Sequence, residues 1–356
     1  MRILLVTNDY PPKPGGIQQY LGSLVPALPA EVRVLAPRDD GPAPGSVRRH
    51  RRRFMWSTRE VRRWVEEQVA EFRPDVILFG APHPLAHMGP ALRRATGVPY
   101  AVLCHGAEVT LPAAFPVARQ LVRWPLRRAD ALFAVSRFTS RRVERLTRRP
   151  VTYVGAGVDV AAFTPASAPP ETPVIGCVSR FVPRKGQRRV LEAAAALRDE
   201  GVTADVLLVG KGRDERALRR LAGRLGLPVR FEVGVPWARL PDLYREMTIF
   251  AMPCTSRWFG LEVEGLGLVF LEGAAAGLPV VAGDSGGSPE TVLPGRTGFV
   301  VDRTDALVEG LRLLLGDPEK ARAMGAAGRE RVVAEFTWEA VAERLLAGLS
   351  AVTRSG

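Results

Sequence analysis

Two glutamates, Glu264 and Glu272, lie eight positions apart in a segment that is otherwise apolar and rich in glycine. The leucines and alanines of residues 266–276 favour a helix, so Glu264 should lie at or before its first turn and Glu272 two turns further on. One ligand could then contact both carboxylates, and the unpaired N–H groups of the first turn suit a diphosphate. The alternative is a solvated cap and an exposed helix residue, because Glu pairs at this spacing are common on helices.

Two cations, Arg180 and Lys185, follow the apolar run 174–178. In a tight loop at a strand tip they could neutralise a diphosphate whose bond is being broken. Loop cations that merely stay solvated are the alternative. Glycines follow other predicted strands of this half. The turn at Gly286 and Gly287 would face the same cleft, and Gly210 could border the nucleobase.

The first half of the chain begins with a similar arrangement. An apolar run is followed by a loop that ends in Gly15 and Gly16 and then by a predicted helix over residues 17–28. Strand, glycine loop and helix form a phosphate-binding arrangement, although a plain turn explains two glycines equally well. His105 follows another apolar run, so its imidazole should lie at a strand tip and point at a sugar hydroxyl or a backbone carbonyl.

Apolar runs that alternate with helical stretches should position these residues. This alternation is typical of α/β domains with mostly parallel sheets, in which ligands lie beyond the carboxyl ends of the strands. Residues 155–173, rich in glycine and proline, interrupt the pattern and predict a linker between two such domains. The predicted strands are residues 2–7, 31–37, 75–80, 99–105 and 131–136 before the linker, and residues 174–178, 204–209, 229–233, 249–252, 280–282 and 298–301 after it.

Composition restricts the class of protein. A chain of 356 residues with 46% hydrophobic residues is large enough for two cores. No run is long enough to span a membrane, and the N-terminus begins at once with a strand, so we expect a cytoplasmic protein. Three cysteines far apart in sequence, without the spacing of zinc ligands, indicate reduced core thiols, and the histidines show no metal spacing either.

Positive charge is concentrated in the first half. Residues 1–160 contain 25 Lys and Arg against 13 Asp and Glu, whereas the remaining residues contain 25 against 24. Residues 59–72 predict an amphipathic helix, and residues 115–128 mix arginines with aromatic and aliphatic residues, which suits an anionic lipid surface. A helix whose arginines only face water is the alternative. Nucleic acid is not favoured as a partner, because no known reading module is visible.

Together these motifs resemble glycosyltransferase family 4, whose members are retaining enzymes. Six of them follow the family's order: Gly15-Gly16-Ile17, His105-Gly106, Gly157-Val158-Asp159, Arg180 with Lys185, Glu264 with Glu272, and Gly286-Gly287 with Glu290. The resemblance implies a GT-B fold, in which two Rossmann-like domains with parallel sheets face a central cleft. Residues 1–160 would bind the acceptor, residues 161–336 a nucleotide sugar, and residues 337–356 would form a helix that packs back on the first domain.

Within the family, residues 6–12, 15–18, 179–187 and 261–268 are most similar to actinobacterial members that transfer mannose from GDP-mannose. The acceptor of those members is a phosphatidylinositol mannoside at the inner membrane face, and the linkage is α-1,6. The resemblance implies that no metal or further cofactor is required. The excess positive charge of the first half favours a peripheral contact of that domain with an anionic membrane. The alternatives are a soluble small-molecule acceptor with another nucleotide-sugar donor, and a non-catalytic nucleotide-sugar or lipid-binding protein.

The resemblance also implies a role for each residue of the site. Arg180 and Lys185 would hold the diphosphate, Glu272 the ribose hydroxyls and Glu264 the donor sugar, with His105 touching that sugar from the other domain. The remaining donor contacts would come from Gly15, Gly16, Gly210, Gly267, Leu268, Gly286 and Gly287.

Overall fold

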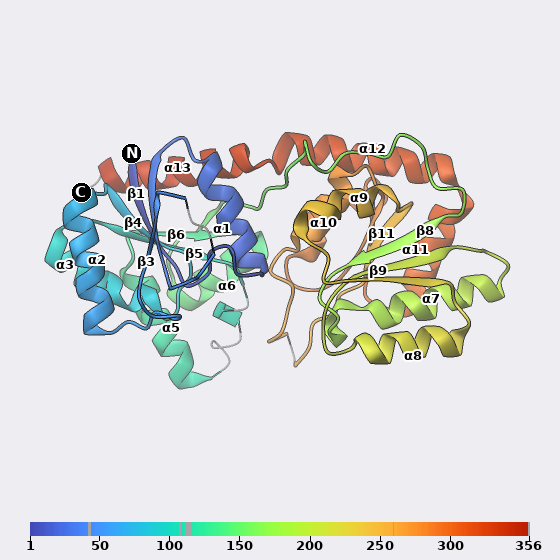
Figure 1. Ribbon diagram of the computed structural model, residues 1–356, viewed down its shortest axis with the longest axis horizontal. Coiled ribbons are helices and arrows are strands. Elements are labelled where there is room, and N and C mark those ends of the chain that lie inside the picture. Colours follow the sequence, from blue (N-terminus) through green and yellow to red (C-terminus); the bar gives the residue numbers. More distant parts are fainter. Residues whose placement is uncertain (42–43, 107, 111–114, 259, 355–356) are drawn as a thin grey trace. The chain divides into compact units, whose positions relative to one another are not determined.

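The computed structural model describes residues 1–41, 44–106, 108–110, 115–258 and 260–354 (Figure 1). The chain forms two compact units. Unit 1 contains Met1–Gly157 and the C-terminal segment from Trp338, and unit 2 contains Val158–Thr337. The sequence led us to expect boundaries at residues 160 and 336, and the assignment of acceptor and donor to the two units stays a prediction.

Unit 1 is built on a parallel sheet in the order β3-β2-β1-β4-β5-β6-β7. The five predicted strands are confirmed. Two edge strands were not predicted, because three and two residues are too few to show a periodic pattern. The strands are β1 (Arg2–Val6), β2 (Glu31–Ala36), β3 (Val47–Arg49), β4 (Val76–Phe79), β5 (Tyr100–Cys104), β6 (Ala131–Ala134) and β7 (Thr152–Tyr153).

The helices of unit 1 bury one side each, and that of α2 is apolar. The predicted stripe of residues 59–72 is confirmed, since Val61, Val65, Val69 and Phe72 of that helix are all buried. The hydroxyl of Thr58 caps the same helix by accepting a hydrogen bond from the N–H of Val61. The helices are α1 (Gly16–Ala27), α2 (Arg59–Phe72), the short 3₁₀ helix η1 (Leu85–Met88), α3 (Gly89–Thr96), α5 (Pro116–Arg128), α6 (Arg137–Thr147) and α13 (Trp338–Arg354).

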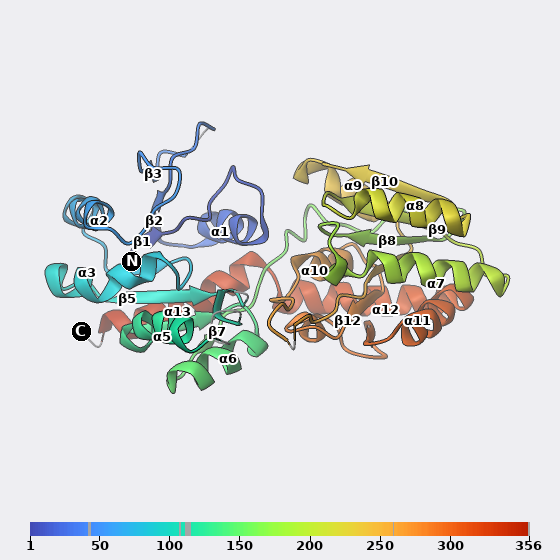
Figure 2. The ribbon, with the colours of Figure 1, turned by 90° about the horizontal axis from the view of Figure 1, so that it is seen from below.

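The last helix, α13, belongs to unit 1. It packs on α1 and β6, and both views show it beside the sheet of that unit (Figures 1 and 2). The indole of Trp338 meets the ring of Tyr20 edge to face at 5.2 Å. Leu345 and Leu349 are fully buried, so hydrophobic burial holds this helix in place.

Unit 2 repeats the architecture with a parallel sheet in the order β10-β9-β8-β11-β12-β13. Four of its six predicted strands have the predicted limits. The strands are β8 (Val174–Val178), β9 (Asp205–Gly210), β10 (Val229–Val233), β11 (Ile249–Met252), β12 (Val280–Gly283) and β13 (Gly298–Val301). The helices are η2 (Pro183–Lys185), α7 (Gln187–Asp199), α8 (Glu215–Leu225), η3 (Trp237–Arg239), α9 (Leu240–Arg245), α10 (Leu268–Ala275), η4 (Ser288–Thr291), α11 (Thr304–Gly316) and α12 (Pro318–Glu335).

The three cysteines are free thiols inside the two cores, as predicted. Within the part of the chain that the structure describes, no helix has the length and apolar character needed to cross a membrane. Nor do three His, Cys, Asp or Glu side chains gather there as a metal ion would require.

Candidate active site

Glu264 lies at the centre of a buried ion cluster in unit 2, just before α10. The guanidinium of Arg184 (Nη1) and the ammonium of Lys185 (Nζ) each lie 2.6 Å from the same carboxylate oxygen, Oε2 of Glu264. All three side chains are buried. The interpretation of Glu264 as a solvated cap is therefore wrong.

The charge state of Glu264 follows from these contacts. Burial alone would raise the pKa of this carboxyl, but Lys185 and Arg184 outweigh burial and lower the pKa to about 2. Since the folded-state pKa lies below the ordinary value of 4.5, the cluster stabilises the fold above that value. The contribution is lost as the pH falls from there toward 2. At neutral pH Glu264 is an anion that can accept hydrogen bonds.

Glu272 lies one helical turn into α10 and is only 3% exposed, so the exposed-residue interpretation is wrong here as well. The hydroxyl of Tyr244, on α9, donates to its Oε2 at 2.9 Å. Burial, followed by the charge of Glu272, raises the pKa of this phenol far above its ordinary value, so it stays a neutral donor. The hydrogen bond from Tyr244 holds the Glu272 carboxylate in one orientation.

Helix α10 begins at Leu268, two residues later than predicted. The backbone of Gly267 has φ +93°, a left-handed conformation that favours glycine, and this residue occupies the cap position. Its place ahead of the helix leaves the N–H groups of Leu268 and Val269 at the helix start, where α-helices have no internal partner for them. Glu264 is three residues upstream, so carboxylate and amides belong to one short segment.

The loop after β8 carries Arg180. Its side chain is exposed and makes no ion pair with any residue that the structure describes. The buried side chain of Gln187 fixes the backbone of this loop by donating to Ser179 Oγ at 2.7 Å and to the Arg180 carbonyl at 2.9 Å. Gly210, at the end of β9, packs against the same loop, because a Cβ atom there would lie 1.9 Å from the Ser179 carbonyl oxygen.

The glycine pair after β12 holds the backbone of Glu264. The N–H of Gly287 donates to the Glu264 carbonyl at 2.9 Å, and the N–H of Glu264 donates to Ser285 Oγ at 3.2 Å. Gly286 has φ +62°, and a Cβ atom there would lie 2.0 Å from the Glu264 carbonyl oxygen. The Gly287 amide, expected to contact phosphate or sugar, is thus already used within the protein.

Substituting Gly286 by alanine should disturb the site through this contact. We expect a loss of roughly 1–3 kcal/mol in the free energy of unfolding, measured by denaturant titration, together with reduced turnover. The matched control is Gly295→Ala, because Gly295 has φ +76° but no atom within 4 Å of its Cβ position. That variant should show only the backbone cost, roughly 1 kcal/mol, with normal turnover. Equal effects in the two variants would contradict a role for Gly286 in placing Glu264.

In unit 1, His105 follows β5 as predicted, and its ring is tied to the protein. Its Nε2 lies 2.9 Å from the carbonyl oxygen of Gly80, so Nε2 carries the proton and Nδ1 is left as an acceptor. The histidine is buried, and burial lowers its pKa, which keeps the ring neutral near pH 7. The ring of His105 thus contacts a backbone carbonyl, which was one of the two partners expected for it. Contact of His105 with a sugar stays a prediction.

Gly15 and Gly16 precede and begin α1. A Cβ atom on Gly15 would lie 2.1 Å from Oε1 of Gln18, whereas no atom lies within 4 Å of such a position on Gly16. The amide of Gln18 donates to Asp9 Oδ1 at 2.7 Å. Burial raises the pKa of the Asp9 carboxyl, and the opposing effect of His105 is smaller, so the pKa lies above its ordinary value. Gly16 therefore leaves open space at the start of α1, whereas Gln18 fills the space beside Gly15.

Several residues of these sites were not predicted. They are Arg184 and Tyr244 in unit 2, and Asp9 and Gln18 in unit 1. Arg184 could have been suspected, since it directly precedes Lys185 in a short loop between a strand and a helix. Tyr244 gives no signal, because one tyrosine in a short helix has no pattern that marks it.

The arrangement in unit 2 suits a particular ligand. An exposed arginine, a buried lysine and a helix start can bind an anionic diphosphate, and two buried carboxylates can accept hydrogen bonds from sugar hydroxyls. Such a site, in a chain with two α/β units that are each built on a parallel sheet, is what a glycosyltransferase of the GT-B class requires.

The comparisons agree with this class. Residues 14–162 match Glycosyltransferase Family 4, and residues 162–331 match Glycosyl transferases group 1. The chain is 39% identical to the GDP-mannose-dependent alpha-(1-6)-phosphatidylinositol monomannoside mannosyltransferase of Mycolicibacterium smegmatis, with 98% of each chain covered. It is 38% identical, over 97% of each chain, to the enzyme of that name from Mycobacterium tuberculosis. The chain therefore belongs to glycosyltransferase family 4.

Solved structures support the fold. Sucrose-phosphate synthase from Thermosynechococcus elongatus is 21% identical, with complete coverage of both chains and a TM-score of 0.83. Anabaena HepE in complex with UDP is 20% identical over 99% of this chain and 100% of that chain, with a TM-score of 0.82. At such identities the likeness shows the fold, which is GT-B as predicted.

Proposed function

We propose that this hexosyltransferase moves mannose from GDP-mannose to a phosphatidylinositol monomannoside and forms an α-1,6 linkage. The observation that carries this proposal is the similarity to the two mycobacterial mannosyltransferases, which extends over nearly the whole of each chain. The buried anion–cation cluster of unit 2 supports it, because a nucleotide sugar presents a diphosphate next to a polyhydroxylated ring.

In the proposed reaction the bond between the anomeric carbon and the leaving phosphate oxygen breaks. The acceptor hydroxyl forms its new bond to that carbon on the same face, so the configuration is retained, and its proton passes to the leaving phosphate. Arg180 and Lys185 neutralise the charge that develops on the diphosphate, and Glu264 accepts hydrogen bonds from the sugar. Glu272 accepts those of the ribose hydroxyls. No side chain is required as a nucleophile.

A transfer assay tests the proposal. Purified protein with GDP-mannose and phosphatidylinositol monomannoside should release GDP and give a product with one more hexose, cleavable by an α-1,6-specific mannosidase. UDP-glucose should be a poor donor. Transfer only to soluble polyols would favour a soluble acceptor, and nucleotide-sugar binding without transfer to any acceptor would favour a binding protein. Either result would overturn the proposal.

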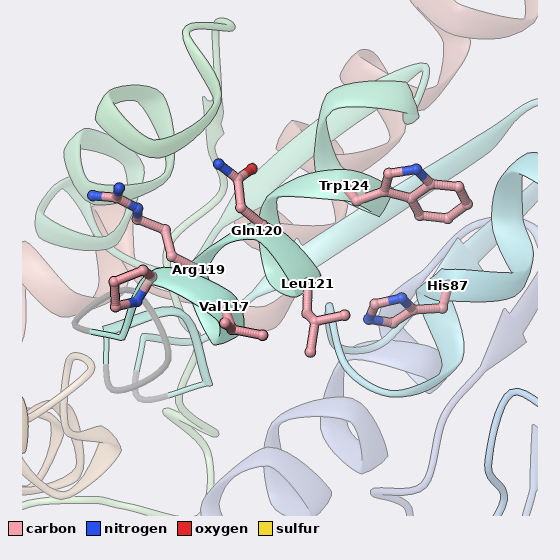
Figure 3. A pocket seen from close by; sticks show the side chains of 7 residues that line it. His87, Val117, Arg119, Gln120, Leu121 and Trp124 are labelled. Atoms are coloured by element: carbon pink, nitrogen blue, oxygen red, sulfur yellow. The ribbon is translucent and has the colours of Figure 1, made fainter.

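The outer face of α5 supports a contact with lipid. Val117, Leu121 and Trp124 recur at helical spacing and are 76%, 53% and 42% exposed, while Val122 and Leu126 on the opposite side are buried. A pocket of about 820 Å³ lies along the exposed residues. Figure 3 shows Leu121 and the ring of His87 on one side of α5 while Gln120 points away.

The same helix carries positive charge. Three arginines of α5 are exposed, namely Arg119, Arg127 and Arg128, and the guanidinium of Arg128 covers the Trp124 ring of the apolar face at 4.7 Å. Exposed apolar residues flanked by arginines are typical of helices that lie in an anionic membrane interface. We propose that α5 contacts the membrane that holds the acceptor.

Leu121→Asp should weaken the binding of the protein to anionic vesicles. The variant loses a leucine that would be buried in the lipid and gains one negative charge. Its partition coefficient should therefore fall roughly tenfold or more in a sedimentation assay with phosphatidylserine vesicles. Leu313→Asp is the control, because Leu313 is a comparably exposed leucine of unit 2. Equal binding of both variants, or equal binding of the wild type to neutral and anionic vesicles, would count against this surface.

A further inference from the structure

Arg184 is a buried cation to which the proposed reaction gives no role. Arg184 is only 9% exposed. Its carbonyl accepts a hydrogen bond from the N–H of Thr255 at 2.8 Å, and this bond ties η2 to the loop after β11. Its Nη1 reaches Glu264, and its Nε lies 3.4 Å from Oε1 of Glu262. Because burying a guanidinium is costly, its place between two carboxylates needs a reason.

The charge balance around Glu264 suggests one. Arg184 and Lys185 contact the same oxygen of Glu264. Glu262, which lies 3.4 Å from Arg184, is also paired with Arg257 at 3.7 Å, so the five side chains together carry one net positive charge. Without Arg184, the charges of Lys185 and Glu264 would cancel. Charges interact strongly at buried positions, where the effective dielectric constant is well below that of water. The charge that Lys185 can offer to an anionic ligand therefore depends on Arg184.

We propose that Arg184 compensates the charge of Glu264, so that the ammonium of Lys185 keeps its positive charge for the donor diphosphate. The proposal rests on the proposed function, in which Lys185 faces that diphosphate and Glu264 faces the sugar. Arg184 is a positioning residue, since it acts through Glu264 and need not touch the donor. It allows one small site to hold an anion for the sugar beside a cation for the leaving group.

A purely structural role is the competing explanation, in which Arg184 only ties η2 to the loop that carries Glu262 and Glu264. The two explanations differ in one respect. If Arg184 compensates charge, the loss of diphosphate affinity caused by its removal depends on the negative charge of Glu264 and disappears when that charge is removed. If Arg184 is a structural tie, removing the charge of Glu264 does not restore the affinity.

The binding of GDP, measured by titration calorimetry at about pH 7.5, separates these explanations. GDP carries the diphosphate and the ribose but no mannose, so the proposed contact of Glu264 with the mannose does not enter the measurement. Arg184→Gln should weaken GDP binding about 10- to 100-fold, because the compensating charge is lost. Arg184→Lys keeps the positive charge, so this variant should bind GDP with most of the wild-type affinity.

The decisive variant is the double substitution Arg184→Gln with Glu264→Gln. It should bind GDP several-fold more tightly than Arg184→Gln alone, because nothing then neutralises Lys185. The matched control is Arg188→Gln, since Arg188 is an exposed arginine of the next helix, α7, and pairs with Glu192. That control should bind GDP like the wild type.

The pH dependence gives an independent readout. Without Arg184 the pKa of Glu264 should rise, so GDP binding by Arg184→Gln should recover toward the wild-type value as the pH falls from about 8 to about 5. Comparison with the wild type at each pH cancels the titration of GDP itself. The other charged or titratable groups around the cluster are Lys185, Glu262, Arg257 and Cys254. Burial raises the pKa of the Cys254 thiol to about 11, so it stays neutral.

Two outcomes would overturn the inference alone: wild-type affinity in Arg184→Gln, or a folded double variant that binds no better than Arg184→Gln. If Arg184→Gln does not fold, the double variant is compared with Glu264→Gln, and a large difference in GDP affinity between them contradicts the inference. A wild-type protein that binds no GDP would instead overturn the proposed function, and the inference with it.

Discussion

Replacement of Arg180 by alanine should lower the turnover of mannose transfer about a hundredfold and leave the melting temperature unchanged. Removing a cation that stabilises a leaving group typically costs ~3 kcal/mol of transition-state stabilisation, which corresponds to that factor. The fold should persist, because the Arg180 side chain is exposed and its loop is held by Gln187 through backbone and hydroxyl contacts. The measurement is kcat at saturating GDP-mannose, with a thermal melt of the same sample.

The control for this variant is Arg224→Ala. Arg224 is also an exposed arginine of unit 2 but lies in the last turn of α8. Its loss should change kcat less than about twofold, because a solitary surface charge contributes little. If Arg180→Ala keeps a turnover close to that of the control, Arg180 does not hold the leaving diphosphate.

Lys185→Ala should also reduce kcat about a hundredfold or more, but with a measurable loss of stability. Lys185 is buried and lies 2.6 Å from Glu264, so its removal breaks a buried ion pair. Removal of one partner of such a pair usually costs ~3–5 kcal/mol because it leaves an uncompensated charge. Here Arg184 still neutralises Glu264, so we expect a smaller loss, roughly 1–3 kcal/mol in denaturant titration.

The lysine control is Lys320→Ala on α12, where the side chain is exposed. It should match the wild type in both turnover and stability. Near-normal kcat in Lys185→Ala would remove this lysine from the reaction. A stability loss as large as that of a fully unpaired buried charge would show that Arg184 does not compensate Glu264.

The fold could be predicted largely from local patterns. The buried strands of a parallel sheet are continuous apolar runs, so β8, β11 and β13 were predicted to the residue. The limits of β10 were also predicted, although its apolar residues alternate with Arg230 and Glu232. The apolar stripe at helical spacing predicted the buried face of α2. The edge strands β3 and β7 were missed because they are short and hold few buried residues.

The candidate site was only partly predictable. Arg180 and Lys185 became candidates because they follow a predicted strand, and parallel sheets place such loops at one edge. Glu264 became a candidate through its spacing to Glu272 at the start of a predicted helix. The contacts among these residues could not be predicted, since the pairing of Lys185 with Glu264 joins positions 79 residues apart. The alternatives for Glu264 and Glu272 differed only in burial, which depends on packing from the rest of unit 2.

The most direct test of the account is a crystal structure of the protein with bound GDP-mannose. The diphosphate should lie within hydrogen-bonding distance of Arg180 and Lys185, with the mannose at Glu264 and the ribose at Glu272. A donor bound elsewhere on the protein, with the loop after β8 and the start of α10 left empty, would contradict the account.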